Sequence, residues 1–167
     1  MRDVVHAERK INRAILISRL NGWSIVIVAL LSVLVTLFAK SLFGTVVGLA
    51  VLVAGYLELR GHKLLVSRNI SAVSWLTISQ WYLMAVLFAY SIINLVQFDA
   101  NDPWAPFSSS FKELVLAINP DVYLVETMLK ISYHAVYVSL IVAVLVYQGG
   151  LSIYYFSLKK YLYANTL

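Results

Sequence analysis

The stretch GTVVGLAVLVAGYLEL, residues 44–59, joins an apolar run to three glycines and one carboxylate. At about 100° per residue, Gly44, Gly48 and Gly55 fall on one narrow stripe of a helix, and Glu58 follows on it. Gly44 and Gly48 form a GxxxG motif, which lets two helix backbones approach closely. The stripe predicts a helix–helix interface, within the chain or between subunits. The alternative is the ordinary abundance of glycine in membrane helices.

The composition of the chain places it in a membrane. Of its 167 residues, 61% are hydrophobic and only 13% are charged. A soluble domain is about 45–50% apolar and about 25% charged. The apolar residues also gather in long runs, which one small water-soluble core could not bury.

Four apolar runs have about the length of a membrane span, which takes about 20 helical residues. They cover residues 21–39, 42–59, 71–98 and 131–158. We therefore predict an all-α polytopic integral membrane protein, with four transmembrane helices in an antiparallel bundle and residues 1–167 as a single membrane domain. Residues 40–41 predict a tight hairpin between the first two helices, and residues 99–130 form the one long loop.

Charge indicates the orientation of the chain. Basic residues concentrate in residues 1–20, after the second run and in the tail at 159–167, whereas acids gather in residues 99–130. Because cytoplasmic loops carry an excess of Lys and Arg, both termini are predicted in the cytoplasm, with the spans in a cytoplasmic membrane. Residues 1–20 read as a basic amphipathic helix that rests on anionic lipid headgroups before the chain turns into the first span at Asn21. For a chain this apolar with a net charge of +5, we expect anionic lipid headgroups rather than nucleic acid as the binding partner.

The long loop, residues 99–130, contains sequence signals for the start of two helices. SFKE, residues 110–113, reads as a capping box with Ser110 as N-cap of a short helix over residues 111–118. We expect this helix to lie flat on the outer membrane surface, with Trp104 and Phe107 as interfacial anchors. Asn119 before a proline predicts the start of another helix, which either breaks near Lys130 or continues into the fourth span.

Polar residues inside the spans should face protein rather than lipid. The third and fourth runs each carry such a stripe, and the two stripes are predicted to face each other or a shared cavity. Together with the carboxylate of the second run, the candidate cavity residues are Glu58, Thr77, Gln80, Ser91, Asn94, His134, Tyr137 and Ser152.

LVYQGGLSIYY, residues 145–155, interrupts the fourth run with a glutamine and two glycines. Gln80 and Gln148 lie at similar depth in antiparallel helices, roughly 14 Å from the cytoplasmic ends. We predict a hydrogen bond between them, direct or through water, as a clasp at the helix interface. Gly149 and Gly150 would then allow a neighbour to approach closely or the helix to unwind. A binding site at a broken helix is the alternative.

Glu58 has two interpretations. In the first it sits at the cytoplasmic interface, and its carboxylate pairs with Arg60, His62 or Lys63. In the second it is buried and lines a polar cavity with Gln80 and Gln148, which would make a proton or cation site.

Several kinds of chemistry lack their sequence signals. There are no cysteines, which excludes disulfides, thiolate catalysis and thiolate-bound metals. No Walker A, GxGxxG, HExxH or GxSxG motif occurs. His134, alone at its depth, suits a hydrogen-bonded role better than haem ligation, which usually takes two axial ligands. We expect no cofactor, no metal and no enzymatic activity.

These observations favour a non-enzymatic membrane protein that acts as a helix-packing subunit, of a homo-oligomer or of a larger membrane complex. A small oligomeric channel lined by the polar stripes of the third and fourth spans is the alternative. A lipid- or quinone-binding subunit that uses the Gln148–Gly150 notch is a weaker one.

Overall fold

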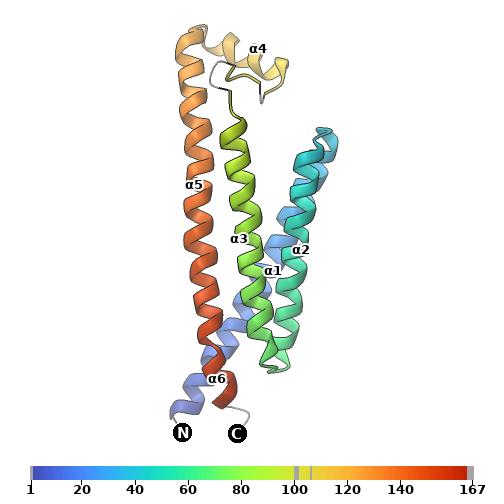
Figure 1. The fold of residues 1–167 in the computed structure, drawn as a ribbon, viewed down its shortest axis with the longest axis vertical. Helices are drawn as coiled ribbons and strands as arrows, with labels where there is room; N and C mark the ends of the chain where they lie inside the picture. Colours follow the sequence, from blue (N-terminus) through green and yellow to red (C-terminus); the bar gives the residue numbers. More distant parts are fainter. Residues whose placement is uncertain (1, 100–101, 106, 165–167) are drawn as a thin grey trace. The chain divides into compact units, whose positions relative to one another are not determined.

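The computed structural model describes residues 2–99, 102–105 and 107–164. These residues form helices and no strand (Figure 1). The helices are α1 (Arg2–Phe38), α2 (Leu42–Val66), α3 (Ser71–Gln97), α4 (Ser109–Ile118), α5 (Val122–Ser157) and α6 (Lys159–Ala164). Four helical stretches are long and apolar enough to cross a membrane: Ala7–Phe38, Leu42–Val66, Ser71–Gln97 and Val122–Leu162. The predicted all-α polytopic fold is confirmed.

The chain divides into two compact units, Met1–Val86 with Val144–Leu167, and Leu87–Ala143. The first unit contains α1, α2, α6 and parts of α3 and α5. Its apolar core draws on all five of these helices, because each helix presents one apolar stripe to the others. The core residues are Ile11, Ala14, Leu65, Ala72, Val73, Leu76, Tyr155, Leu158 and Leu162.

Helices α1 and α2 form the predicted hairpin and lie side by side (Figure 1). Ser41 caps α2, since its side chain accepts a hydrogen bond from the Gly44 backbone N–H at 3.2 Å. The glycine stripe of α2 faces α1 of the same chain. A Cβ added at Gly48 would lie 2.7 Å from Cγ2 of Val33 and 3.3 Å from its backbone nitrogen. The two backbones therefore approach closely only because this position has no side chain.

Two helix ends on this side differ from the sequence predictions. α1 is continuous through Asn21, so the predicted separation of a surface helix from the first span is corrected. Gly22 lies inside α1 and makes room there for Leu59 of α2. A Cβ added at Gly22 would lie 2.8 Å from Cδ2 of Leu59. α2 likewise continues beyond Leu59 to Val66. Gly61 supports this extension, because it is buried against Leu76 of α3.

In the second unit, the N-caps of two helices differ from the predicted ones. The N-cap of α4 is Ser108 instead of Ser110, because the Ser108 side chain accepts from the backbone N–H of Phe111. Asp121 rather than Asn119 caps α5, since its carboxylate accepts from the backbone N–H of Leu124 at 3.1 Å. α5 then runs unbroken to Ser157, so the fourth span is continuous with the helix that follows Pro120. The predicted loop end at residue 130 is corrected accordingly.

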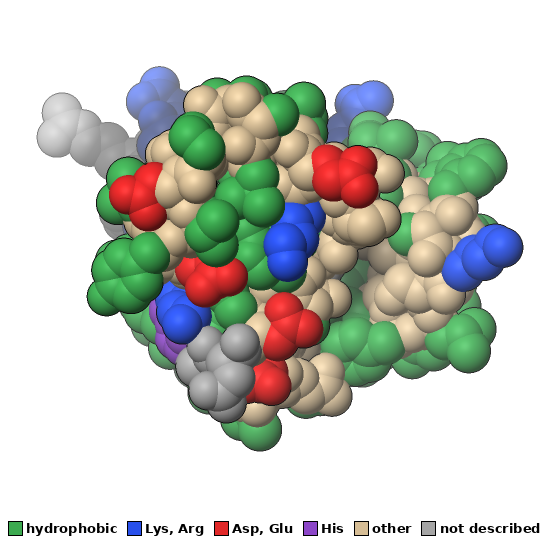
Figure 2. All heavy atoms as spheres, turned by 90° about the horizontal axis from the view of Figure 1, so that it is seen from above, with side chains coloured by type: hydrophobic (Ala, Val, Ile, Leu, Met, Phe, Trp, Pro, Cys, Tyr) green, Lys and Arg blue, Asp and Glu red, His purple; other side chains and the backbone are tan. Residues whose placement is uncertain are grey.

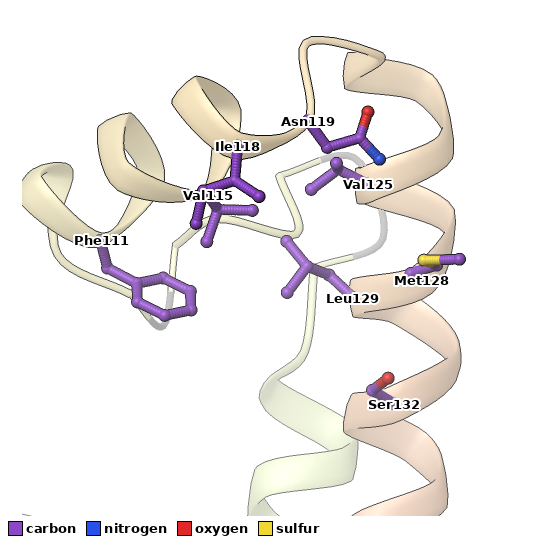
Figure 3. A pocket seen from close by; sticks show the side chains of 8 residues that line it. All are labelled: Phe111, Val115, Ile118, Asn119, Val125, Met128, Leu129 and Ser132. Carbon is purple, nitrogen blue, oxygen red and sulfur yellow. The ribbon is translucent and has the colours of Figure 1, made fainter.

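Helix α4 packs its apolar face toward the start of α5. Figure 3 shows Val115 and Ile118 of α4 near Val125 and Leu129 of α5, across a cavity of about 330 Å³. Trp104 is 6% exposed and donates its indole N–H to Glu126 at 3.1 Å, so its predicted role as an interfacial anchor is corrected. A buried indole satisfies its donor inside the protein rather than in the headgroup layer. Whether α4 lies on a membrane surface stays a prediction.

The close approach of α1 and α2 predicts that Gly48→Ala destabilises the protein. Its new methyl would meet Cγ2 of Val33, and a β-branched side chain has little rotamer freedom to move away. The expected loss is about 1–3 kcal/mol of unfolding free energy, measured by thermal unfolding in mild detergent. Ala85→Val is the control, because it enlarges a side chain at an exposed position of α3. Equal destabilisation by both substitutions would contradict the packing assigned to Gly48.

Candidate functional site

Four helices of the first unit meet at the carboxylate of Glu58. Its Oε1 accepts hydrogen bonds from Asn21 Nδ2 of α1 at 3.1 Å and from the Tyr155 hydroxyl of α5 at 2.8 Å. Its Oε2 accepts from Gln80 Nε2 of α3 at 2.7 Å. Glu58 itself is 0% exposed. We call Asn21, Glu58, Gln80 and Tyr155 the Glu58 cluster.

Close backbone contacts next to the Glu58 cluster hold its residues in place. A Cβ added at Gly22 would lie 3.3 Å from Cγ of Glu58, so the absence of a side chain there lets α2 come within reach of Asn21. On the opposite side, the Ser79 hydroxyl of α3 donates to the Ala54 carbonyl of α2 at 2.9 Å in the buried interior. This bond fixes α3 against α2 one residue before Gln80.

Glu58 has no ion pair with any residue that the structure describes. The interfacial interpretation of this carboxylate is therefore wrong. Arg60 stacks its guanidinium over the Trp75 ring at 4.1 Å, and Nδ1 of His62 lies 3.0 Å from the Ser18 hydroxyl. The physical reason is helical phase. Glu58 shares the inward stripe of Gly55, whereas Arg60 is turned away from it.

The direct hydrogen bond predicted between Gln80 and Gln148 is also corrected. The Oε1 atoms of both side chains are buried and have no hydrogen-bond partner among the described residues. Gln80 instead gives its N–H to Glu58, because a carboxylate is a stronger acceptor than an amide. The structure thus brings Glu58 and Gln80 together, as the second interpretation of Glu58 requires.

No described residue packs against the two glycines that follow Gln148. α5 remains helical through Gly149 and Gly150, which corrects the predicted unwinding and leaves no broken helix for a binding site. A Cβ added at either position would meet nothing within 4 Å. No other described part of this chain therefore fills the notch that they make.

The remaining candidate cavity residues are held mostly by their own helices. In the second unit, the Ser91 hydroxyl donates to Leu87 O at 2.8 Å and Asn94 Nδ2 donates to Tyr90 O at 2.8 Å. These two donors are thus used within α3, and Asn94 also accepts from the Tyr133 hydroxyl of α5, which lies 3.3 Å from its backbone oxygen. His134 is exposed, and its Nδ1 lies 2.8 Å from Lys130 O.

The other candidates are divided between the two units. Tyr137 of the second unit packs its ring against those of Tyr90 and Tyr133, with centroids 5.9 and 4.8 Å away. In the first unit, Ser152 is buried. Thr77 of that unit lines a cavity of about 290 Å³, although its own hydroxyl oxygen is buried without a partner.

Two members of the Glu58 cluster were not among the candidate site residues, although Tyr155 lies on the polar stripe predicted for the fourth span. Asn21 opens the first apolar run and precedes a glycine, which favoured a turn, but it donates to Glu58. Tyr155 follows Gln148 and Ser152 at helical spacing on one face of α5. That shared face was a signal, because a tyrosine at the end of a buried polar stripe has a hydroxyl that needs a partner.

The chemistry available at the Glu58 cluster is one acid among neutral polar groups. Among the described residues, no group of three or more His, Cys, Asp or Glu side chains could hold a metal ion. The cluster can therefore bind helices together through hydrogen bonds, or accept a single positive charge. No known protein family, curated protein or solved structure matches this chain.

Tyr155→Phe should destabilise the protein, because it leaves a buried carboxylate with one donor fewer. The expected cost is about 1–3 kcal/mol, measured by thermal unfolding in mild detergent. Tyr154→Phe removes the same hydroxyl one residue earlier, where no residue that the structure describes is hydrogen-bonded to it. A similar loss in both variants would argue against the bond to Glu58.

Proposed function

We propose that this chain is a non-enzymatic integral membrane protein that works by helix packing, as a subunit of a homo-oligomer or of a larger membrane complex. The observation that carries the proposal is the Glu58 cluster, which joins four helices of one chain at a single buried point. Buried hydrogen bonds that converge in this way fix the arrangement of the four helices. The outer faces of these helices then remain available to other helices or to lipid.

Those outer faces are extensive. Within the four apolar stretches, between 17% and 28% of the most apolar window is buried inside the chain. In lipid, apolar surface alone does not drive helices together, and close packing at small residues contributes instead. An interface with another chain should therefore contain small residues as well as exposed apolar ones.

One face of α5 combines both features. Val146 and Ile153 are 71% and 74% exposed, and Gly149 and Gly150 lie between them at helical spacing. We propose that a helix of a second copy or of another subunit packs on this α5 face, defined by Val146, Gly149, Gly150 and Ile153. Gly44, Gly48 and Gly55 of α2 already face α1, and Gly61 faces Leu76 of α3, so these positions are not open to a further helix.

Hydrogen bonds favour packing over the channel alternative. Gln80 is bonded to Glu58, and Ser91 and Asn94 are bonded to carbonyls of their own helix. Polar groups that already form hydrogen bonds within the chain are less available to line a water-filled pore. No comparable observation favours the lipid- or quinone-binding alternative.

Gly150→Leu should lower the copy number of the protein if a second chain packs on the α5 face. A Cβ added at Gly150 would meet no described residue within 4 Å, so a leucine there should leave the fold intact while it blocks the interface. Native mass spectrometry in mild detergent measures the copy number. Ala85→Leu places the same side chain at another exposed position and should leave the copy number unchanged. A wild-type monomer with no co-purifying subunit would contradict the proposal.

We further propose that both termini lie in the cytoplasm and that the α4 side faces outward. The exposed Arg9, Arg13 and Arg19 of α1 would then contact anionic headgroups of a cytoplasmic membrane. Figure 2, seen from above relative to Figure 1, shows acidic side chains together with some Lys or Arg side chains on the face toward the viewer. The orientation is supported by the sequence, because acids gather in residues 99–130 and basic residues in residues 1–20 and 159–167.

The absence of cysteine makes the orientation easy to test. Ser67→Cys, after α2, and Ser110→Cys, in α4, each introduce a unique thiol at an exposed position. In intact cells, a membrane-impermeant maleimide should label Ser110→Cys only, and both thiols should react after the membrane is opened. Labelling of Ser67→Cys in intact cells would reverse the proposed orientation.

A further inference from the structure

A cavity of about 290 Å³ lies at the end of the first unit where α3 begins and α5 ends. Along α3 its lining runs from Ser74, in the first turn of the helix, to Thr77 and Ile78 one turn further along. Phe156 of α5 and Lys159, the first residue of α6, line it from the other side. The cavity therefore opens between helices at one end of the apolar spans.

The Thr77 hydroxyl in this cavity is a donor that its own helix does not use. Its oxygen is buried and has no hydrogen-bond partner among the described residues. The other threonines that the structure describes, Thr36, Thr45 and Thr127, each donate to the carbonyl four residues earlier, at 2.9, 2.9 and 2.8 Å. Such back-bonding is common for helical threonines, and a buried hydroxyl without a partner is costly. An acceptor from outside the chain would remove this cost at Thr77.

The other lining residues give the cavity a polar end and an apolar end. Lys159 is exposed and has no ion pair or hydrogen bond with any residue that the structure describes. None of the described lining residues is acidic. Deeper along the spans, Ile78 and Phe156 are 53% and 65% exposed. From the helix ends inward, the cavity thus presents an ammonium group, the hydroxyls of Ser74 and Thr77, and then apolar side chains.

We propose that this cavity binds one anionic phospholipid. In a phospholipid the phosphate, the ester carbonyls and the acyl chains follow one another in the same order. The Lys159 ammonium pairs with the phosphate, and the Thr77 hydroxyl donates to an ester carbonyl. The acyl chain lies along Ile78 and Phe156. Basic pockets between transmembrane helices are a common kind of lipid headgroup site.

The size of the cavity agrees with partial enclosure of such a lipid. Pockets that enclose a whole small molecule measure about 300–1,000 Å³. A cavity of about 290 Å³ therefore holds the headgroup and the start of one acyl chain, while the rest of the lipid stays in the bilayer. The proposed orientation places this end at the cytoplasmic leaflet, whose surface is negatively charged. Affinity measured in detergent does not depend on that orientation.

The lipid site is separate from the features that support the proposed packing function. No residue of the Glu58 cluster and none of the α5 face is among the described residues that line the cavity. The Gln148–Gly150 notch, the place of the lipid- or quinone-binding alternative, does not line it either. The bound lipid adds a contact between α3 and the α5–α6 end of the chain. A failure of the lipid site would therefore leave the copy number and the helix packing untouched.

The test is photo-crosslinking of the purified wild-type protein in mild detergent. The probe is a phosphatidylglycerol that carries a diazirine near the start of one acyl chain, and peptide mass spectrometry identifies the residues that it labels. We expect labelling to concentrate on the residues that line the cavity. Unlabelled phosphatidylglycerol should suppress this labelling at a lower concentration than phosphatidylcholine with the same acyl chains. Inorganic phosphate should not suppress it, because it has no acyl chain.

Three results on the wild-type protein would overturn the proposal. Equal suppression by both lipids would show that the cavity takes any acyl chain and does not recognise an anionic headgroup. Suppression by inorganic phosphate would show a site for a free anion. Labelling spread evenly over the exposed apolar faces of the helices would show that no lipid site exists here.

A pair of lysine substitutions tests the role of the ammonium group. Lys159→Gln and Lys160→Gln remove the same charge from neighbouring exposed positions, but only Lys159 lines the cavity. For Lys159→Gln, the probe concentration that gives half-maximal labelling should rise about fivefold, which corresponds to about 1 kcal/mol for one lysine near an anionic lipid. For Lys160→Gln it should stay near the wild-type value. Equal increases would show diffuse attraction of the probe to a basic segment, against the site.

A pair of threonine substitutions tests the buried hydroxyl. Thr77→Val keeps the shape of the side chain and removes its donor, so the same concentration should rise about fivefold, as for the loss of one hydrogen bond of about 1 kcal/mol. Thr127→Val makes the same change outside the cavity, where the hydroxyl is bonded to Tyr123 O, and should leave this concentration unchanged. A wild-type value for Thr77→Val would contradict the contact assigned to its hydroxyl.

Discussion

A buried carboxylate must have its oxygens hydrogen-bonded, and this constraint determines which helices meet in the first unit. Glu58 can be satisfied only if α1, α3 and α5 each bring a donor to the same side of α2. Hydrogen bonds are directional, whereas apolar side chains pack in many ways that are nearly equal in lipid. The carboxylate therefore selects one arrangement of the helices, and the apolar core around Tyr155 and Leu76 fills the space that this arrangement leaves.

Glycine makes this convergence sterically feasible. A side chain at Gly22 would press on Leu59 and Glu58, and one at Gly55 would press on Val26, so side chains here would separate α1 from α2. Asn21 could then no longer reach the carboxylate. Close backbone packing and polar bonding are thus coupled in this hairpin. A substitution at a glycine acts on the hydrogen bonds of a neighbouring residue as well as on van der Waals contacts.

The sequence predicts more of the fold than of the site. Apolar runs identify four spans because membrane thickness sets their length. Helix ends were less accurate, since Gly22 and Gly61 resemble helix breakers until the residues that pack on them, Leu59 and Leu76, are known. At the site, Glu58 and Gln80 could be selected as polar residues inside apolar runs, and one interpretation of Glu58 placed them together, but the donors Asn21 and Tyr155 could not be assigned. Pairing depends on helix rotation, which the spacing of Gln80 and Gln148 along the chain does not specify.

Packing alone does not explain why an acid occupies position 58. In other proteins, replacing a buried charged network by apolar residues of similar volume is often neutral or even stabilising, by about 1–4 kcal/mol. A leucine at this position could fill space between α1, α3 and α5 without needing three donors. A carboxylate differs from leucine because both of its oxygens accept hydrogen bonds of defined direction, so the donors of α1, α3 and α5 fix how these helices are rotated about α2. Gln80 follows the same constraint, since its Nε2 donates to Glu58 although its Oε1 is then buried without a partner among the described residues.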